Sequence, residues 1–194
     1  MEKKQSKTYN SSLVSNEDKV AFLMMLGLRS RWISGIYGVA TSRVRSISKT
    51  IRKYGFSQQL ASGSEPTSVS IICSRGRMIE ASLLVHFYKK VSENFDKREV
   101  DLEAFLKAYK LYVNARHSVG GMNEKTWSII NAQQAYVLLN ELHLGESIFQ
   151  ACHVCGCNYY LTLAQTAVAD DCPFCRPPTI HHYHKKRSKF SNVS

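Results

Sequence analysis

Two Cys-x-x-Cys pairs near the C-terminus constrain this chain more than any other feature. Cys152 and Cys155 form the first pair, Cys172 and Cys175 form the second, and sixteen residues separate the inner cysteines. Each pair brings two sulfurs close enough to bind one ion, and two pairs complete a tetrahedral site that suits zinc. This spacing is typical of zinc sites. Residues 158–163, between the pairs, are aromatic and β-prone, so we expect a zinc ribbon.

Other uses of paired thiols fit the sequence less well. A redox disulfide needs one such pair beside a βαβ pattern, which the chain lacks. A zinc deaminase carries His-x-Glu and then Pro-Cys-x-x-Cys, whereas here Pro173 follows Cys172 and no His-x-Glu occurs. An iron–sulfur cluster uses the same four ligands, and spacing alone does not separate it from zinc. Four sulfur ligands leave no open position for water, so we expect one structural Zn²⁺ per chain.

The two remaining cysteines lie outside the paired motif. Cys73 is far from the others in sequence, and Cys157 directly follows the first pair. Small thiols of this kind usually pack as apolar groups, so we expect both to be buried. Cys157 is also close enough in sequence to replace Cys155 as a ligand.

The formal net charge of +11 is distributed unevenly along the chain. Residues 19–55 hold eight basic and no acidic residues, residues 76–150 hold nine of each, and residues 176–194 hold five basic and no acidic residues. Surfaces that need only solubility mix both signs, so acid-free runs favour a polyanionic partner such as nucleic acid. The chain has no apolar run of membrane-spanning length, no secretory signal and cysteines in metal-site spacing, so we expect the cytoplasm.

The first basic region has the pattern of a helix-turn-helix. A helix that begins at Glu17 or Asp18 is followed by a short apolar segment around Ile33–Tyr37, and Gly38 suits the turn. Thr41 or Ser42 is the expected N-cap of the next helix, which ends near Gly55. A plain basic helical hairpin is the alternative. In a helix-turn-helix the second helix lies in the major groove and its early residues face base edges. We therefore expect DNA contacts from Thr41, Ser42, Arg43, Arg45, Ser46, Lys49, Arg52 and Lys53.

The rest of the chain divides by composition. We expect a disordered tail at 1–18, the helix-turn-helix-like region at 19–55 and a Ser- and Gly-rich linker at 56–75. A helical partner-binding region at 76–150, the zinc ribbon at 151–178 and a basic tail at 179–194 follow. Lys185, Lys186 and Arg187 in that tail are expected to add contacts to DNA phosphates. The expected fold is mainly α with a small C-terminal zinc ribbon.

The central helices show the clearest periodicity in the chain. Apolar residues recur at helical spacing from Leu102 to Val113, and an earlier helix is expected to bury the side formed by Met78, Ile79, Leu83, Phe87 and Val91. Asp96 with Glu99 suits a capping box before the second of these helices. A third helix is expected from about Asn123 to Gly145. The histidines at 86, 117 and 143 are expected to be packed or surface side chains, and His181, His182 and His184 have no fold to preorganise a second metal site. No catalytic constellation stands out, so we expect no enzyme activity.

The chain resembles the FlhC family, the C subunit of the bacterial flagellar master transcriptional activator. The resemblance rests on Leu26–Arg29, on Ser42–Arg45 and on the central segment Lys107–Tyr112. Its most specific part is Cys152-x-x-Cys155 followed by Cys172-Pro173-Phe174-Cys175-Arg176-Pro177-Pro178 and a basic tail. It covers roughly residues 19–189 in order.

The resemblance implies a zinc site held by Cys152, Cys155, Cys172 and Cys175. It also implies a hetero-oligomer with a small helical D-type subunit that binds double-stranded promoter DNA and assists RNA polymerase. The Lys-rich N-terminus and the linker depart from the flagellar pattern, and distant relatives on conjugative plasmids and integrative elements activate transfer genes instead. The alternative hypothesis is a zinc-ribbon adaptor that binds RNA or an acidic protein.

Overall fold

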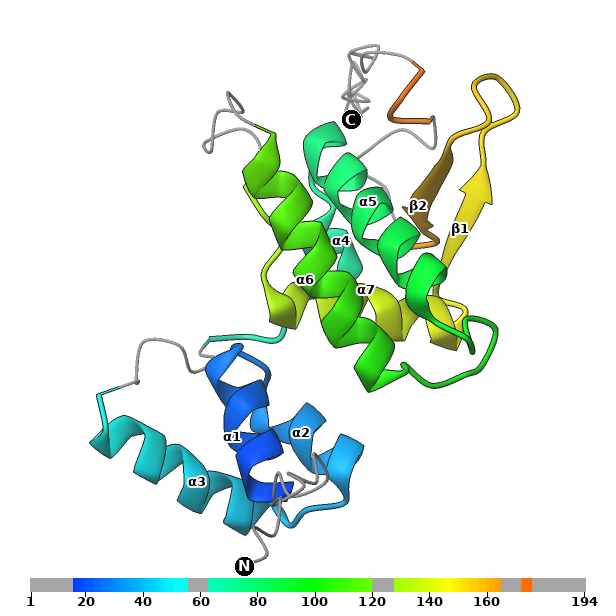
Figure 1. The fold of residues 1–194 in the computed structure, drawn as a ribbon. Coiled ribbons are helices and arrows are strands. Elements are labelled where there is room, and N and C mark those ends of the chain that lie inside the picture. Colours follow the sequence, from blue (N-terminus) through cyan, green and yellow to red (C-terminus); the bar gives the residue numbers. More distant parts are fainter. Residues whose placement is uncertain (1–15, 56–62, 120–127, 165–171, 176–194) are drawn as a thin grey trace, which may run out of the picture.

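The computed structural model describes residues 16–55, 63–119, 128–164 and 172–175. Within these ranges the chain forms seven helices and one two-stranded antiparallel sheet near the C-terminus (Figure 1). The expected mainly helical fold with a small C-terminal ribbon is therefore confirmed. None of the described helices combines the length and the apolar character needed to cross a membrane.

Three short helices form the N-terminal unit. They are α1 (Asn16–Met25), α2 (Ser30–Tyr37) and α3 (Thr41–Lys53). Each contacts the other two, and their shared core holds Val20, Leu23, Ile33 and Val44. Gly38 ends α2 with φ +62°, a left-handed conformation that glycine adopts without strain. Only Val39 and Ala40 separate Gly38 from α3, which already begins at Thr41. Ala40 is therefore the N-cap of α3, and the prediction of a Thr41 or Ser42 cap is wrong.

Four further helices build the larger part of the molecule. They are α4 (Ser68–Ile71), α5 (Arg75–Val91), α6 (Leu102–Ser118) and α7 (Ala132–Leu144). α5 and α6 lie side by side, and α7 contacts α4, α5 and α6 (Figure 1). The segment expected to be a linker contains α4, which a Thr67–Ser70 capping box begins and whose Ile71 is buried.

The helix boundaries correct two expectations. Asp101 caps α6 by accepting hydrogen bonds from the N–H groups of Glu103 and Ala104, so the predicted Asp96–Glu99 capping box is wrong. In the described residues α7 begins at Ala132 instead of near residue 123, because Asn131 and Gln134 form the capping box there. Residues 123–127, where the helix was expected to begin, lie outside the described residues. Gly145 ends α7 in the left-handed region, as expected.

The C-terminal ribbon consists of β1 (Ser147–Ala151) and β2 (Asn158–Thr162), paired from Ser147↔Thr162 to Ala151↔Asn158. It stands against α5, on the side away from α6 (Figure 1). Tyr160 is fully buried, its N–H donates to Ser82 Oγ at 2.9 Å, and its hydroxyl donates to Leu138 O at 3.2 Å. The base of the ribbon is therefore part of the main core.

The face predicted for α5 is only partly right. Met78 is fully buried, but Leu84, Val85 and Tyr88 carry more of the core than the predicted Leu83 and Phe87, which are half-buried. The reason is that α5 packs against α6 on one side and against β2 on another, so no single stripe describes its buried surface.

The N-terminal unit is attached to α7. The backbone N–H of Arg29 donates to the buried side chain of Gln133 at 2.8 Å. One turn further along α7, the ring of Tyr136 meets Trp32 edge-on with centroids 5.4 Å apart. These contacts fix the start of α2, and through it the orientation of α3, on the helical body.

Candidate metal centre and nucleic-acid interface

Four cysteine side chains converge beyond the end of the ribbon. The sulfurs of Cys152, Cys155, Cys172 and Cys175 all lie within 4.8 Å of one another. Cys152 Sγ is 3.5 Å from Cys175 Sγ, and Cys155 Sγ is 3.7 Å from Cys172 Sγ. A disulfide requires about 2.05 Å, so these pairs are not bonded. Four thiolates about 2.3 Å from one central ion lie about 3.8 Å apart, so the cluster fits a single metal ion.

Backbone N–H groups prepare the first pair of cysteines for this role. Hydrogen bonds from the N–H groups of Cys155 and Val154 lower the pKa of Cys152 to about 6. The N–H of Cys157 lowers the pKa of Cys155. Thiolates are the form that binds a metal ion, so the turn stabilises the ligand state before any ion is present. Gly156 makes this turn possible with φ +72°, and its N–H donates to Cys152 O at 2.9 Å.

The pKa values of the second pair are shifted upward. The hydrogen bond to Cys155 raises the pKa of Cys175 to about 12, and burial raises the pKa of Cys172. Four thiolates this close together repel one another, and a bound cation offsets that repulsion. The donor set therefore fits a thiophilic ion such as zinc.

A long-range hydrogen bond positions the second pair. Arg75, the first residue of α5, donates through Nε to Pro173 O at 2.6 Å. This contact holds residues 172–175 at the start of α5, although Arg75 and Pro173 are 98 residues apart in the sequence. Sequence reasoning missed Arg75, because nothing in the local pattern links it to the cysteines.

The structure corrects the expectation for both spare cysteines. Cys73 and Cys157 are exposed instead of buried. Cys157 contributes its backbone, since its O accepts from the N–H of Cys152 at 2.9 Å, and its sulfur is not in the four-cysteine cluster. The exposed thiol of Cys157 forms a hydrogen bond with the side chain of Cys155, and this contact raises the pKa of Cys157.

The described histidines are packed or surface side chains, as expected. His86 and His117 are exposed. His143 Nε2 lies 3.1 Å from the hydroxyl of Tyr88, and Nδ1 contacts Lys97 O. These contacts tie α7 to α5 and to the loop before α6. The cluster at residues 181–184 lies outside the described residues.

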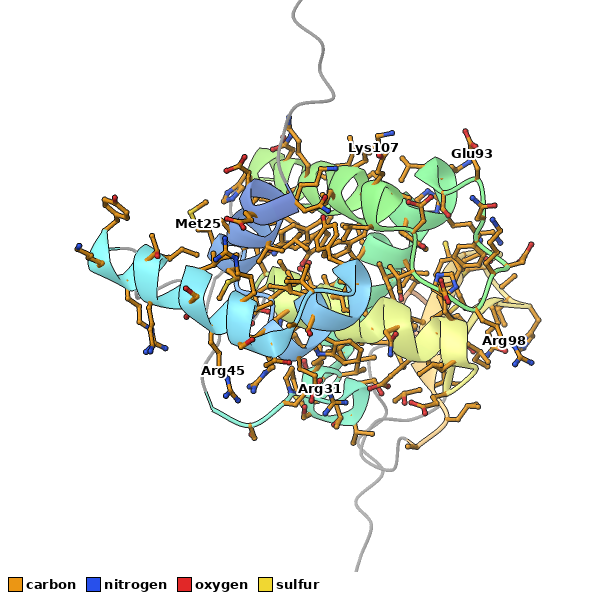
Figure 2. The ribbon with its side chains drawn as sticks, turned by 90° about the horizontal axis from the view of Figure 1, so that it is seen from below. Met25, Arg31, Arg45, Glu93, Arg98 and Lys107 are labelled. Carbon is orange, nitrogen blue, oxygen red and sulfur yellow. The ribbon has the colours of Figure 1, made fainter. Side chains whose placement is uncertain are left out.

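Helix α3 carries the basic residues that the sequence singled out. Ser42, Ser46, Lys49 and Lys53 are exposed and follow one another at helical spacing on the face opposite buried Val44 and Ile51. Arg45 and Arg52 are exposed on the flank that adjoins α2. Figure 2 shows Arg45 and Arg31 projecting on the same side of the molecule.

Arg43 lies on the opposite flank of α3, toward α1. Its Nε donates to Glu17 Oε1 at 3.0 Å, and Nη2 forms a second contact with the same oxygen. Both side chains are 56% exposed, and exposed pairs of this kind contribute at most about 1 kcal/mol. The sequence did not separate Arg43 from Arg45, although their positions on the helix put them on different flanks. Lys185, Lys186 and Arg187 lie outside the described residues.

Taken together, these features define a mainly helical protein that combines an N-terminal helical unit with a basic face and a C-terminal ribbon whose four clustered cysteines could hold a metal ion. The model of the family described as "Flagellar transcriptional activator (FlhC)" matches residues 9–188, nearly the whole chain, so the chain belongs to the FlhC family of transcriptional regulators. Among curated proteins none matches the chain.

Proposed function

We propose that this chain is the DNA-binding subunit of a transcriptional activator and acts in the cytoplasm at flagellar or conjugative-transfer promoters. The observation that carries the proposal is the exposed basic face of α3 in a three-helix unit that belongs to the FlhC family. α3 presents cations on its outer face and on both flanks, and no acidic residue occurs in residues 19–55. A surface of this kind attracts the phosphate backbone of nucleic acid.

Different faces of α3 are proposed to contact different parts of the duplex. Ser42, Ser46 and Lys49 point away from the core and are assigned to base edges and the groove floor. Lys53, Thr41 and the flanking Arg45 and Arg52 are assigned to the groove walls, where phosphates lie. Arg43 reaches DNA by exchanging Glu17 for a base or phosphate. The basic residues at 185–187 add backbone contacts.

The four cysteines are proposed to hold one structural Zn²⁺ per chain. The sulfur separations of 3.5 and 3.7 Å support one ion instead of a multi-iron cluster, whose inorganic sulfides would force the ligands further apart. With all four ligands supplied by the protein, the ion has no free position for substrate. Metal analysis of the purified chain should give one zinc and no iron per chain, and stoichiometric iron would contradict the assignment.

The partner is proposed to be a small helical D-type subunit, with RNA polymerase as the target of the assembled complex. Residues 76–150 have no net charge and expose apolar side chains on α6 and beyond it, with Leu111 43% and Val119 51% exposed. Neutral surfaces with apolar residues suit protein contacts better than DNA contacts. A neighbouring reading frame that encodes a D-type protein would support this assignment.

Selection from a randomised pool of duplexes tests the function directly. The full-length chain, alone and with the D-type subunit, should enrich a defined sequence and bind it more tightly than random duplex or single-stranded RNA. Log affinity should fall with log salt by about 0.9 per neutralised phosphate. Preference for RNA, or binding that ignores duplex sequence in both preparations, would favour a zinc-ribbon adaptor instead.

Substitutions on α3 test the residue roles. Lys49→Ala should lower affinity for the selected duplex by about 1–3 kcal/mol more than for random duplex if Lys49 contacts a base edge. Arg45→Ala should weaken both duplexes alike if it contacts phosphate. The reverse result would exchange the two assignments, and no effect from either would remove α3 from the interface.

A further inference from the structure

A basic hollow lies beside α3, on the flank that adjoins α2. Its volume is about 740 Å³, and it is bounded by the first residues of α2, one flank of α3 and Glu65 of the segment before α4. Four arginines from these elements line it: Arg29, Arg31, Arg45 and Arg52. With Glu65 as the only acid among the lining residues, the hollow has a net charge of +3. A concave surface of one sign concentrates counter-ions and suits an anionic ligand.

The remaining polar lining consists of hydroxyl groups. On α3, Thr41, Arg45, Ser48 and Arg52 alternate hydroxyl and guanidinium groups along one flank of the helix. From α2, Ser34 donates to Val39 O at 2.5 Å and its Oγ lies 3.4 Å from Thr41 Oγ1. Guanidinium and hydroxyl groups together are the usual ligands of phosphate oxygens in proteins.

The segment that closes the hollow is held by one of its arginines. Arg29 Nη2 donates to Gly63 O at 2.8 Å and to Ser64 O at 2.5 Å. The same residue is fixed to α7 through its backbone N–H, as described above. Arg29 therefore holds one wall of the hollow in place, while Arg31, Arg45 and Arg52 face solvent on the open side.

The Glu65 carboxylate lines the hollow and has an interaction partner for only one of its two oxygens among the described residues. Its Oε2 lies 3.3 Å from Arg31 Nη1. Its Oε1 is buried and has no hydrogen-bond partner among the described residues. A half-satisfied carboxylate is held weakly, because the Arg31 side chain is 76% exposed and the other oxygen has lost its solvent without gaining a donor. A phosphate group offers more acceptor oxygens to the same arginines.

We infer that this hollow is a phosphate-binding site that takes one backbone phosphate of the duplex on α3, and that Glu65 is an internal competitor which the phosphate displaces from Arg31. The inference rests on the proposed function. It adds Arg31 and Glu65 to the interface and makes the α2 flank of α3 the side on which the DNA strand enters. Duplex binding then includes a fixed cost for displacing the Glu65 carboxylate.

Substitutions at Glu65 and Arg31 test the inference in opposite directions. The full-length chain, with its D-type subunit where the pair is needed for binding, is titrated with the selected duplex by fluorescence anisotropy from low to high salt. Glu65→Gln should tighten binding about threefold to tenfold at low salt, with the gain shrinking as salt rises, as for one partly exposed charge. Arg31→Gln and Arg52→Gln should each weaken binding and, because both contact the same phosphate, each should reduce the salt slope by at most about 0.9.

Matched controls separate this site from a general charge effect. Lys107→Gln on α6 removes the same charge from the opposite side of the molecule in Figure 2 and should change neither affinity nor slope beyond about twofold. Arg31→Lys should restore most of the affinity if charge is what matters. Thermal unfolding of each variant checks the fold, and Glu65→Ala replaces Glu65→Gln if the latter is unstable.

The possible results lead to different conclusions. If the wild-type chain binds duplex and the variants at Glu65, Arg31 and Arg52 bind it equally well, the inference is overturned and the proposed function remains intact. Wild-type chain that binds no duplex, alone or with its partner, would overturn the proposed function itself. Inorganic phosphate is titrated in parallel by monitoring the ¹⁵Nε–H signals of arginine. Phosphate binding in the hollow with unchanged duplex affinity in the variants would show that the site serves a free phosphorylated molecule instead of the DNA backbone.

Discussion

Replacing Tyr112 with Phe should test the buried polar network that joins α5, α6 and the segment before α7. Tyr112 is fully buried, and its hydroxyl donates to Glu80 Oε2 at 2.7 Å while it accepts from the N–H of Ile130 at 2.9 Å. On its other oxygen Glu80 pairs with Arg116 at 2.6 Å, and both of those side chains are buried. One hydroxyl group therefore serves a buried carboxylate and a buried backbone donor together.

The cost of the substitution follows from those two contacts. Losing a hydrogen bond to a charged group costs about 1.5–3 kcal/mol, and leaving the Ile130 N–H buried without a partner costs about 1–3 kcal/mol. Single substitutions seldom exceed about 4–5 kcal/mol, so we expect about 3–4 kcal/mol. For a chain of this size that lowers the melting temperature by about 6–16 °C. Urea unfolding followed by circular dichroism measures the free energy directly.

Tyr109→Phe is the matched control on the same helix. Its hydroxyl donates to Ile130 O at 3.3 Å from a half-buried position, so its loss should cost only about 0.5–1.5 kcal/mol. In a double-mutant cycle, Tyr112→Phe and Glu80→Gln should be coupled by at least about 1 kcal/mol, because they share one hydrogen bond. If Tyr112→Phe costs no more than Tyr109→Phe, the network does not stabilise the fold in the way its geometry indicates.

Three further predictions follow from the metal centre, the buried tyrosines and the helix caps. Removing the metal with a chelator should increase hydrogen exchange at the amide of Val154 but leave the amide of Tyr160 protected, because Tyr160 is anchored in the main core. Loss of protection at both amides would show that the ion holds the whole ribbon in place. Burial raises the pKa of Tyr136 to about 12. The free energy of unfolding should therefore be unaffected by this tyrosine below about pH 10 and should fall by up to about 1.4 kcal/mol per pH unit as pH rises from 10 to 12. Tyr136→Phe should flatten that alkaline decline in urea midpoints, and an unchanged slope would contradict the assignment. Asn131→Ala removes the N-cap of α7 and should cost about 0.5–2 kcal/mol in urea unfolding, and a neutral result would show that the capping box contributes nothing.

Local sequence signals predicted much of the candidate site. Four cysteines in two short motifs defined a ligand set that the structure brings together. Gly38 and Gly145 marked helix ends because only glycine adopts those left-handed conformations freely. The capping residues were harder to place, since Asp, Ser, Thr and Asn occur at several adjacent positions and tertiary contacts decide which of them is used. Asp101, not Asp96, caps α6.

The exposure of individual side chains was the least predictable property. Free cysteines are usually buried, but Cys73 and Cys157 lie at the surface. Periodicity also failed to describe α5, because a helix that contacts two elements has two buried stripes instead of one. Neither failure concerns local geometry; each depends on what the rest of the chain places beside the residue.

By itself the sequence determined which four cysteines could bind one metal ion, the mainly helical class and the concentration of positive charge near both ends of the chain. These properties depend on residues a few positions apart, whose geometry the backbone fixes locally. Only the tertiary structure decided that Arg29 and Arg31 share a hollow with Arg45 and Arg52, that Glu65 enters it, and that Arg75 holds Pro173. Those residues are brought together by the packing of separate helices, and no spacing along the chain encodes which flank of one helix will face another.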